Sequence, residues 1–212
     1  MLQIRTIVSQ PFDENTYVVW LDGRDDALVV DPGLEPELIS ECLRKNRLKA
    51  AAILNTHGHA DHVGGNGAMK REWPEAPLMI GEHDAEMLTD AELNLSAPFG
   101  MPLTSPPADR LLKDGEVLSL AGLELEVRHV PGHSPGHVVF VTRGLTPVRV
   151  LGGDVLFRGS IGRFDFPGGD AEALLRGIQT KLFSLPDDTE VYPGHGPATT
   201  TGREKRTNPY LA

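Results

Sequence analysis

The sequence predicts an α/β protein in which two β-rich halves pack together and are covered by helices. Short β-branched runs bounded by turn residues recur along the 212 residues, and two longer segments carry apolar residues at helical spacing. Strands and helices are mixed at first, a run of strands follows, and a helix and a strand come last. This order disfavours a regularly alternating parallel sheet. No linker divides the chain, so residues 1–212 are expected to form one domain.

The first half is expected to supply five strands and three helices. The clearest helix carries an apolar stripe at helical spacing. Its members are Leu38, Ile39, Cys42 and Leu43. The expected strands are residues 2–8, 16–21, 27–33, 50–54 and 76–81, with the second and third paired as a hairpin, and the expected helices are residues 35–48, 65–74 and 82–90.

The second half is expected to be mostly strands. A proline-rich segment without periodicity, residues 94–109, separates it from the first half and is expected to be a loop lying over a site. One helix is expected at residues 170–185, with Leu174, Leu175, Ile178 and Leu182 on one face. The expected strands are residues 116–120, 123–130, 137–142 and 147–153, and a last one at 189–196 that enters a loop.

The charge balance excludes several classes of partner. The chain has 20 basic and 30 acidic residues and a formal net charge of −10. Such a surface repels polyphosphates and anionic lipids, so neither nucleic acid nor a membrane is expected as a partner. The N-terminus lacks the apolar core of a signal peptide, and the single cysteine allows no internal disulfide. A cytoplasmic location is therefore expected.

The stretch "HGHADH" is the most unusual local feature of the chain. It follows the expected strand at 50–54 and contains His57, His59, Asp61 and His62. His57 and His59 are two apart in extended chain and project to the same side. The chain is expected to turn into a helix after them, which directs Asp61 and His62 elsewhere.

Three further polar residues follow expected strands in glycine-rich turns. His133 lies in "PGHSPGH", Asp154 closes "VLGGD", and His195 lies in "YPGHG". Strand ends that feed turns can bring side chains from distant parts of a sequence into one cleft.

Together these seven residues predict a site for two divalent metal ions. The first ion would be held by His57, His59 and His133, the second by Asp61, His62 and His195, with Asp154 bridging both. Two ions about 3.5–4 Å apart can clamp an attacked oxygen and a leaving group. Zinc is the first choice for this nitrogen-rich set, and iron and manganese also accept these ligands. A structural role, in which a polar loop residue is satisfied by hydrogen bonds to the backbone, would explain any one of the seven. It does not explain all seven together.

Other polar residues allow plainer explanations. Asp31 either orients a ligating histidine or caps its own turn. His137 lies four residues beyond His133 and either approaches the site or is a hydrogen-bonded structural residue. His129 is expected to be an ordinary strand residue, and His83 a surface helix residue.

The motifs "THGHADH", "PGHSPGH", "LGGDVLF" and "YPGHG" together resemble the metallo-β-lactamase superfamily through nearly the whole chain. The resemblance implies an αββα sandwich with the metals at one edge and the ligand roles given above. The stretches "GDVLFRGSIGRFDFPGGD" and "YPGHGPATTTGREKRTNPYL" are similar to short glyoxalase II enzymes, which are hydroxyacylglutathione hydrolases. Zinc β-lactamases often use a cysteine ligand, and the only cysteine here is on a helix, so that branch is not expected.

The resemblance implies hydrolysis of a thioester such as S-lactoylglutathione. A hydroxide bridging the two metals would attack the carbonyl, and Asp61 and Asp154 would be the catalytic carboxylates among the metal ligands. The leaving thiolate is a weak base, with a free-thiol pKa of about 8.5, so it departs without a strong general acid.

Three other functions compete with this one. Persulfide dioxygenases also resemble the chain through "GRFDF" and would use a single iron at His57, His133 and Asp154. A nuclease of the same fold is disfavoured by the acidic balance. A non-catalytic binding module is disfavoured by the complete set of metal ligands.

The tail is the expected recognition element for an anionic thioester. Only 17 residues follow His195, and the helical C-terminal domain with which longer glyoxalase II enzymes help to hold glutathione is expected to be missing. Local positive charge must then offset the acidic surface. Arg203, Lys205 and Arg206 are the candidates, although a solvated charged terminus explains them as simply.

Overall fold

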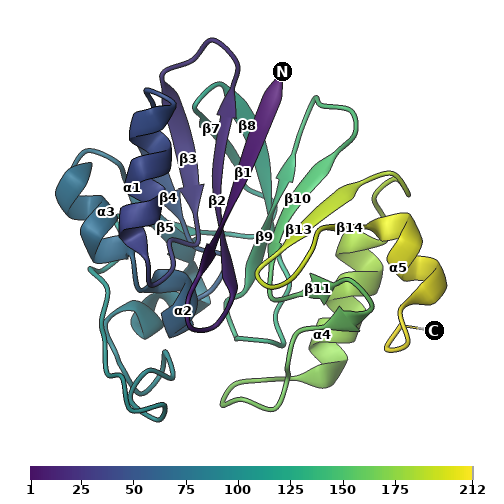
Figure 1. The fold of residues 1–212 in the computed structure, drawn as a ribbon. Coiled ribbons are helices and arrows are strands. Elements are labelled where there is room, and N and C mark those ends of the chain that lie inside the picture. The colour runs from purple at the N-terminus through teal and green to yellow at the C-terminus, as the bar shows by residue number, and fades with distance from the viewer. Residues whose placement is uncertain (212) are drawn as a thin grey trace.

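The fold consists of two six-stranded sheets packed face to face, with helices on the outer surface of each (Figure 1). A computed structural model of the protein describes residues 1–211. The layers run helix, sheet, sheet, helix, so the expected αββα sandwich is confirmed.

The first sheet has the strand order β1-β2-β3-β4-β5-β6. Its strands are β1 (Leu2–Ser9), β2 (Glu14–Leu21), β3 (Asp26–Val30), β4 (Lys49–Leu54), β5 (Leu78–Gly81) and β6 (Arg110–Leu112). The expected hairpin of β2 and β3 is confirmed as an antiparallel pair. From β3 to β6 all pairs are parallel, because helices carry the chain back between them. These are α1 (Pro36–Lys45), α2 (Ala60–Val63), α3 (Asn66–Glu72) and the 3₁₀ helix η1 (Glu82–Leu88).

The second sheet has the order β14-β13-β10-β9-β8-β7. Its strands are β7 (Val117–Leu120), β8 (Leu123–His129), β9 (Val138–Thr142), β10 (Arg149–Gly153), β13 (Glu190–Pro193) and β14 (Thr199–Thr200). Only β10 and β13 pair in parallel, because the helical segment α4 (Ala171–Gly177) and η2 (Ile178–Leu182) crosses between them. A two-stranded ribbon of β11 (Leu156–Phe157) and β12 (Ser160–Ile161) precedes this crossover, and α5 (Thr201–Thr207) follows β14.

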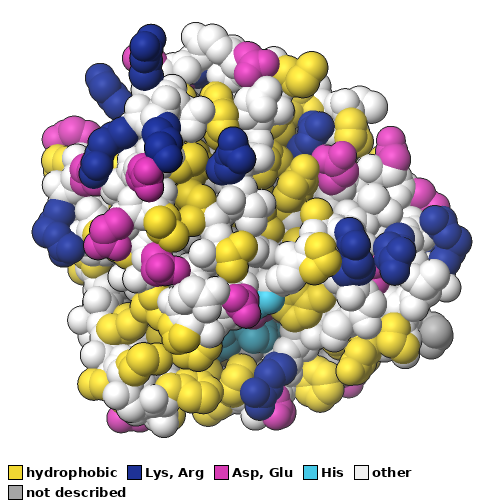
Figure 2. Space-filling model, in the orientation of Figure 1, with side chains coloured by type: hydrophobic (Ala, Val, Ile, Leu, Met, Phe, Trp, Pro, Cys, Tyr) yellow, Lys and Arg dark blue, Asp and Glu magenta, His cyan; other side chains and the backbone are white. Residues whose placement is uncertain are grey.

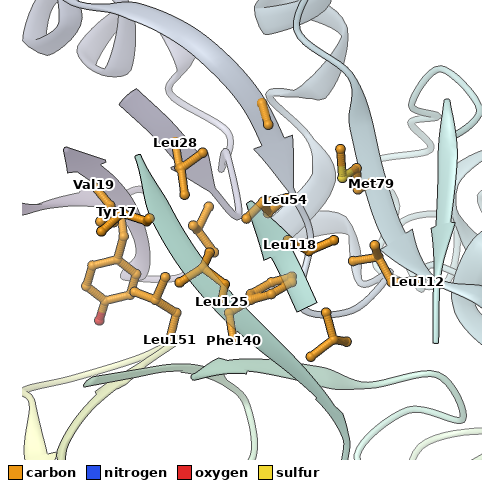
Figure 3. Close-up of a cluster of buried hydrophobic side chains, with 14 of the residues drawn as sticks. Tyr17, Val19, Leu28, Leu54, Met79, Leu112, Leu118, Leu125, Phe140 and Leu151 are labelled. Atoms are coloured by element: carbon orange, nitrogen blue, oxygen red, sulfur yellow. The ribbon is translucent and has the colours of Figure 1, made fainter. Parts of the chain in front are cut away.

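Three hydrophobic clusters hold the layers together. The central one lies between the sheets and includes Leu28, Leu54, Leu125, Phe140 and Leu151, all at most 2% exposed (Figure 3). The second packs the first sheet against α1 and α3, and the third packs the second sheet against α4 and η2. Strands such as β3 and β9 are apolar at successive positions because both of their faces are covered.

The two expected amphipathic helices form, but in each of them one residue of the expected apolar face is less buried than predicted. In α1, Ile39 and Leu43 are buried, but Leu38 is 40% exposed, so the stripe is narrower than its spacing indicates. In the second helical segment, the expected buried face is made by Leu174, Ile178 and Leu182, with Leu175 only half-buried. That segment starts at Asp170, whose side chain accepts a hydrogen bond from the backbone N–H of Ala173 at 2.9 Å.

Several short elements are absent from the sequence-based expectation. The strands β6, β11, β12 and β14 have two or three residues each, too few to show a period. The tail forms α5, which begins where the Thr200 hydroxyl accepts a bond from the Arg203 N–H at 3.2 Å. Among the described residues, every helix is too short or too polar to cross a bilayer.

Candidate metal centre

The end of β4 delivers the "HGHADH" segment to the edge between the two sheets. His57 and His59 precede α2, and His59 is the last residue with extended backbone, at φ −69° and ψ 149°. Asp61 and His62 lie in the first turn of α2, so the expected turn into a helix is confirmed. The change of backbone at Ala60 separates the first two side chains from the second two.

The fold brings the seven predicted metal-binding residues together. Their potential ligand atoms form three overlapping groups, each with all atoms within 4.8 Å of one another. The groups are His57, His59 and His133; His57, His62 and Asp154; and Asp61, His62 and His195. The first and third groups share no residue, so two separate sets of donors exist.

Asp154 lies between the two sets. Its Oδ2 is 3.5 Å from Nε2 of His133 in the first set and 3.6 Å from Nε2 of His195 in the second. Its Oδ1 is 3.6 Å from Nε2 of His62. One carboxylate therefore faces donors of both sets, which is the geometry a bridging ligand needs.

The donor atoms themselves fit a metal. Within residues 1–211, the buried atoms without a hydrogen-bond partner include Nε2 of His57, Nε2 of His62 and Oδ1 of Asp154. A buried polar atom without a partner costs roughly 1–3 kcal/mol. These three residues offer ligand atoms within 4.8 Å of one another, and bound cations would satisfy them, because imidazole with carboxylate suits divalent zinc, iron or manganese.

The local electrostatics also favour bound positive charge. Burial and the neighbouring imidazole of His62 hold the pKa of His57 well below its usual range, so that ring is a neutral donor. Burial opposes charge on His62 too, but the carboxylates of Asp61 and Asp154 raise its pKa well above the usual range. A metal ion at Nε2 of His62 would supply the positive charge that these carboxylates stabilise.

Backbone carbonyls orient two of the outer histidines. Nδ1 of His133 donates to the carbonyl of Arg163 at 2.8 Å, and Nδ1 of His195 donates to the carbonyl of Phe12 at 3.1 Å. Since a carbonyl can only accept, both rings carry a proton on Nδ1, and Nε2 is the ring atom that faces the centre.

Asp31 lies behind the site and contacts two of the residues that shape it. Its carboxylate accepts bonds from the backbone N–H and the hydroxyl of Thr56, both at 2.7 Å. Its Oδ2 also lies 3.2 Å from Nδ1 of His62. Of the two roles considered for Asp31, these contacts support the orienting one, because one buried carboxylate holds the β4 exit and lies beside the His62 ring.

His137 is a buried support for the centre. Its Nε2 accepts the backbone N–H of Asp154 at 3.0 Å, and its ring stacks on that of His57 with centroids 4.7 Å apart. The other two histidines lie apart from the seven. His83 is exposed on η1, and its ring is 5.5 Å from that of His129 at the end of β8.

Asp84 in η1 is a structural residue that the sequence pattern does not reveal. It is fully buried and joins the two histidine loops. Its Oδ2 accepts the N–H of Gly58 at 3.1 Å and the hydroxyl of Ser134 at 2.6 Å, and its Oδ1 accepts the N–H of Gly136. The only sequence signal is indirect: a Cβ on Gly58 or Gly136 would collide with η1, so both glycines mark its close approach.

A cavity of about 480 Å³ opens above the metal-binding residues. Figure 2 shows histidine side chains in a hollow on this face, with hydrophobic side chains gathered around it. The lining includes Phe12, Leu34, Leu95, Phe99, Met101, Leu103, Phe157 and Phe166. Four of these belong to residues 94–109, so the expectation of a loop lying over a site is confirmed.

The basic tail residues are not brought to this cavity. Lys205 and Arg206 in α5 pair with Asp187, at 2.7 and 3.4 Å, and Arg203 lines a separate shallow pocket. The cationic side chain that lines the cavity within residues 1–211 is Arg163. The tail's role in substrate binding stays a prediction, without support from this geometry.

Comparison with known proteins shows the family to which this chain belongs. Residues 10–195 match the Metallo-beta-lactamase superfamily. The chain is 38% identical to hydroxyacylglutathione hydrolase GloC of Haemophilus influenzae, with 99% of this chain and 98% of that protein covered. It is also 38% identical to the probable metallo-hydrolase YqgX of Bacillus subtilis, with 95% and 93% covered.

Solved structures share the fold of this chain. BLEG-1 B3 metallo-beta-lactamase superposes with a TM-score of 0.94 at 37% identity, covering 99% of this chain and all of that one. TTHA1623 in a di-iron-bound form gives 0.85 at 38% identity, covering 98% and 100%. ETHE1 from Myxococcus xanthus gives 0.81 at 25% identity, covering 98% and 83%.

Proposed function

Because this chain belongs to the metallo-β-lactamase superfamily and is a metallo-hydrolase, we propose that it hydrolyses thioesters of the S-lactoylglutathione type. The observation that carries the proposal is the pair of donor sets joined by Asp154 at the base of the cavity. Two divalent cations bound there would lower the pKa of a water molecule and polarise the substrate carbonyl.

In this proposal the chain's own residues hold the metal ions and orient the groups that react. His57, His59 and His133 would hold one ion, and Asp61, His62 and His195 would hold the other. Asp154 would be a ligand to both. The carbonyl groups of Arg163 and Phe12 keep two of the imidazoles aimed inward, and the apolar lining limits water around the reacting carbonyl.

The composition of the lining favours a thioester over an amide. Among the described residues that line the cavity, every histidine and aspartate belongs to the proposed metal-binding set. No such side chain is left to protonate a leaving group. A thiolate leaves as a weak base, with a free-thiol pKa of about 8.5, whereas an amine requires a proton.

The number of bound ions is the first test of this mechanism. Purified protein is expected to carry close to two divalent ions per chain by elemental analysis, because the donors form two sets. Removing them with a chelator should abolish hydrolysis, and adding back zinc, iron or manganese should show which ion restores it. A fully active preparation with one ion per chain would contradict the two-ion proposal.

Arg163 is the side chain we propose for recognition of the anionic thiol moiety. Its guanidinium is held at the edge of the cavity by Asp165, at 2.9 Å, and lies 4.2 Å from the ring centroid of Phe166. We expect Arg163→Ala to raise the KM for S-lactoylglutathione by about fivefold, as for one exposed ion pair, with kcat little changed.

A tail variant with three charges neutralised is the matched control for Arg163→Ala. Changing Arg203, Lys205 and Arg206 to glutamine removes more positive charge, but does so away from the cavity. The KM should stay near that of the parent at low salt. The opposite pattern, an effect from the tail and none from Arg163, would restore the sequence-based expectation.

Persulfide oxidation is the second candidate reaction. It is favoured by the similarity to ETHE1, and it would use one iron at His57, His133 and Asp154. β-Lactam hydrolysis also requires a test, because the similarity to a B3 metallo-beta-lactamase weakens the expectation drawn from the missing cysteine ligand.

One panel on metal-analysed protein separates these activities. Thiol release from S-lactoylglutathione, opening of a chromogenic β-lactam and oxygen consumption with glutathione persulfide are measured side by side. We expect thioester hydrolysis to have the highest kcat/KM. Oxygen consumption by a mono-iron form, or faster β-lactam opening, would overturn the proposal.

A further inference from the structure

The cavity above the metal centre is lined differently by the two halves of the chain. The first half contributes metal-binding residues, two buried polar side chains and otherwise only apolar side chains. We call this surface the apolar wall; its members are Phe12, Leu34, Leu95, Phe99, Met101 and Leu103. The second half contributes Phe157, Phe166 and the cationic Arg163. A substrate with one apolar and one anionic end would match this division.

The two polar side chains next to the apolar wall, Asn94 and Ser96, already make hydrogen bonds within the protein. The Asn94 amide donates to the carbonyl of Leu103 at 3.0 Å, and its Oδ1 accepts from the N–H of Ser96 at 2.9 Å. The Ser96 hydroxyl donates to the same Oδ1 at 2.6 Å and accepts the Leu103 N–H at 3.0 Å. Both side chains are buried, so neither is free to bind a polar substituent of a substrate.

The same bonds build the wall in advance of binding. The carbonyl of Asn94 accepts the N–H of Ala60, the first residue of α2, at 2.9 Å. Farther along, the Ser105 hydroxyl accepts from the Asn66 amide in α3 at 2.9 Å. The loop is thus tied at both ends to the helices next to the metal centre, and its apolar side chains have fixed positions.

Two members of the wall are unusually exposed for their type. Phe99 is 59% exposed and Met101 is 44% exposed, and the ring of Phe99 lies 6.4 Å from that of Phe12, which comes from the β1–β2 turn. Large apolar side chains gathered in the open around a site indicate a surface that a ligand covers. The hydrophobic side chains around the hollow in Figure 2 belong to this face.

We propose that the acyl half of the substrate is an unsubstituted apolar chain or ring, larger than a lactoyl group, that lies against the apolar wall. This inference rests on the proposed thioester hydrolysis and shifts the preferred acyl group from lactoyl to a larger apolar one. A 2-hydroxyl placed on this wall loses its water partners and gains none, because Asn94 and Ser96 are occupied. Methylene groups, in contrast, are transferred from water to apolar side chains.

A chain-length series tests the proposal. Glutathione thioesters of acetate, butyrate, hexanoate and octanoate, together with S-lactoylglutathione, are hydrolysed by the metal-loaded protein under initial-rate conditions. The kcat/KM should rise about fourfold per methylene, the factor expected for roughly 0.8 kcal/mol per buried CH₂, until the wall is covered. Hexanoyl should then exceed lactoyl by at least about tenfold. A flat or falling series would overturn the proposal while leaving thioester hydrolysis in place.

A double variant tests the wall itself. Phe99→Ala with Met101→Ala removes two exposed side chains, so folding should be preserved. The ratio of hexanoyl to acetyl kcat/KM should fall about tenfold or more, because the longer chain loses the side chains that it would cover. Leu93→Ala is the matched control, because Leu93 is 46% exposed just before the same loop and does not line the cavity. An unchanged ratio in the double variant, or an equal loss in the control, would contradict the assignment.

A binding measurement separates failure of this inference from failure of the proposed function. Glutathione thioethers with methyl, butyl and hexyl groups cannot be hydrolysed, and calorimetry gives their affinities directly. Affinity should increase with chain length in the parent protein and much less in the double variant. If no thioester is hydrolysed but this trend persists, the proposed reaction is wrong and the apolar wall stands. Affinity that is independent of chain length would overturn the wall.

Discussion

Replacing Asp154 by alanine is expected to lower kcat/KM by at least about 10²-fold and to reduce bound metal well below two ions per chain. Metal polarisation of a substrate supplies several kcal/mol to such reactions, and roughly 10²-fold corresponds to 2.7 kcal/mol. The Asp154 carboxylate faces donors of both sets, so its loss should weaken the binding of both ions. Metal content by elemental analysis and thioester turnover are measured on the same preparation.

Alanine variants of two other aspartates serve as comparisons for Asp154→Ala. Asp188→Ala removes an exposed carboxylate that belongs neither to the donor sets nor to the cavity lining, so metal content and rate should match the parent. Asp31→Ala removes an orienting contact to His62 rather than a ligand, and metal affinity should fall by about 10- to 100-fold. If Asp154→Ala kept normal metal content and a normal rate, the bridging role would be wrong.

The gathering of the seven candidate metal-binding residues was predictable, because the signal for each lies in the sequence next to it. Each of the seven residues follows a strand whose apolar pattern is visible, and strand ends at one sheet edge converge. The alternation at "HGHADH" also fixes which side chains share a direction, since His57 and His59 are extended and Asp61 starts a helix. No long-range knowledge of packing is needed for either step.

Substrate recognition was not predictable in the same way. The charge of the tail is plain in the sequence, but its pairing with Asp187 depends on where α5 packs. The access of Arg163 to the cavity depends on the short β11–β12 ribbon, whose two-residue strands leave no periodic signal. Tertiary packing therefore decides which cationic side chain lies at the cavity.

The parallel half of the first sheet shows a similar limit. The sequence identifies β3, β4 and β5 as apolar runs, and the intervening helices by their spacing, but it disfavours alternation for the chain as a whole. The structure contains one alternating stretch, from β3 to β6, inside a mixed sheet. The order of strands and helices was judged over the whole chain, and the largely antiparallel second half therefore obscured the alternating stretch in the first half.

Asp84→Ala is expected to lower the free energy of unfolding by about 3 kcal/mol or more, since a buried donor left without a partner costs about 1–3 kcal/mol. Three donors lose their acceptor: the N–H groups of Gly58 and Gly136 and the hydroxyl of Ser134. Because Gly58 lies between two of the metal-binding histidines and Ser134 follows a third, the variant should also loosen the first donor set. Urea unfolding of metal-free protein measures the first effect, and metal titration of folded protein measures the second.

Ser134→Ala is the matched control for Asp84, because it removes one of the three bonds and leaves the carboxylate with its two backbone donors. It should cost about 1 kcal/mol and change metal affinity little. If Asp84 positions the histidine loops, its loss must lower metal affinity in molecules that are still folded, and thioester kcat must fall with it. If Asp84 only supports the fold, stability falls while the folded fraction binds metal as tightly as the parent. The second pattern would contradict the positioning role, because the two loops would then hold their geometry without the carboxylate that joins them.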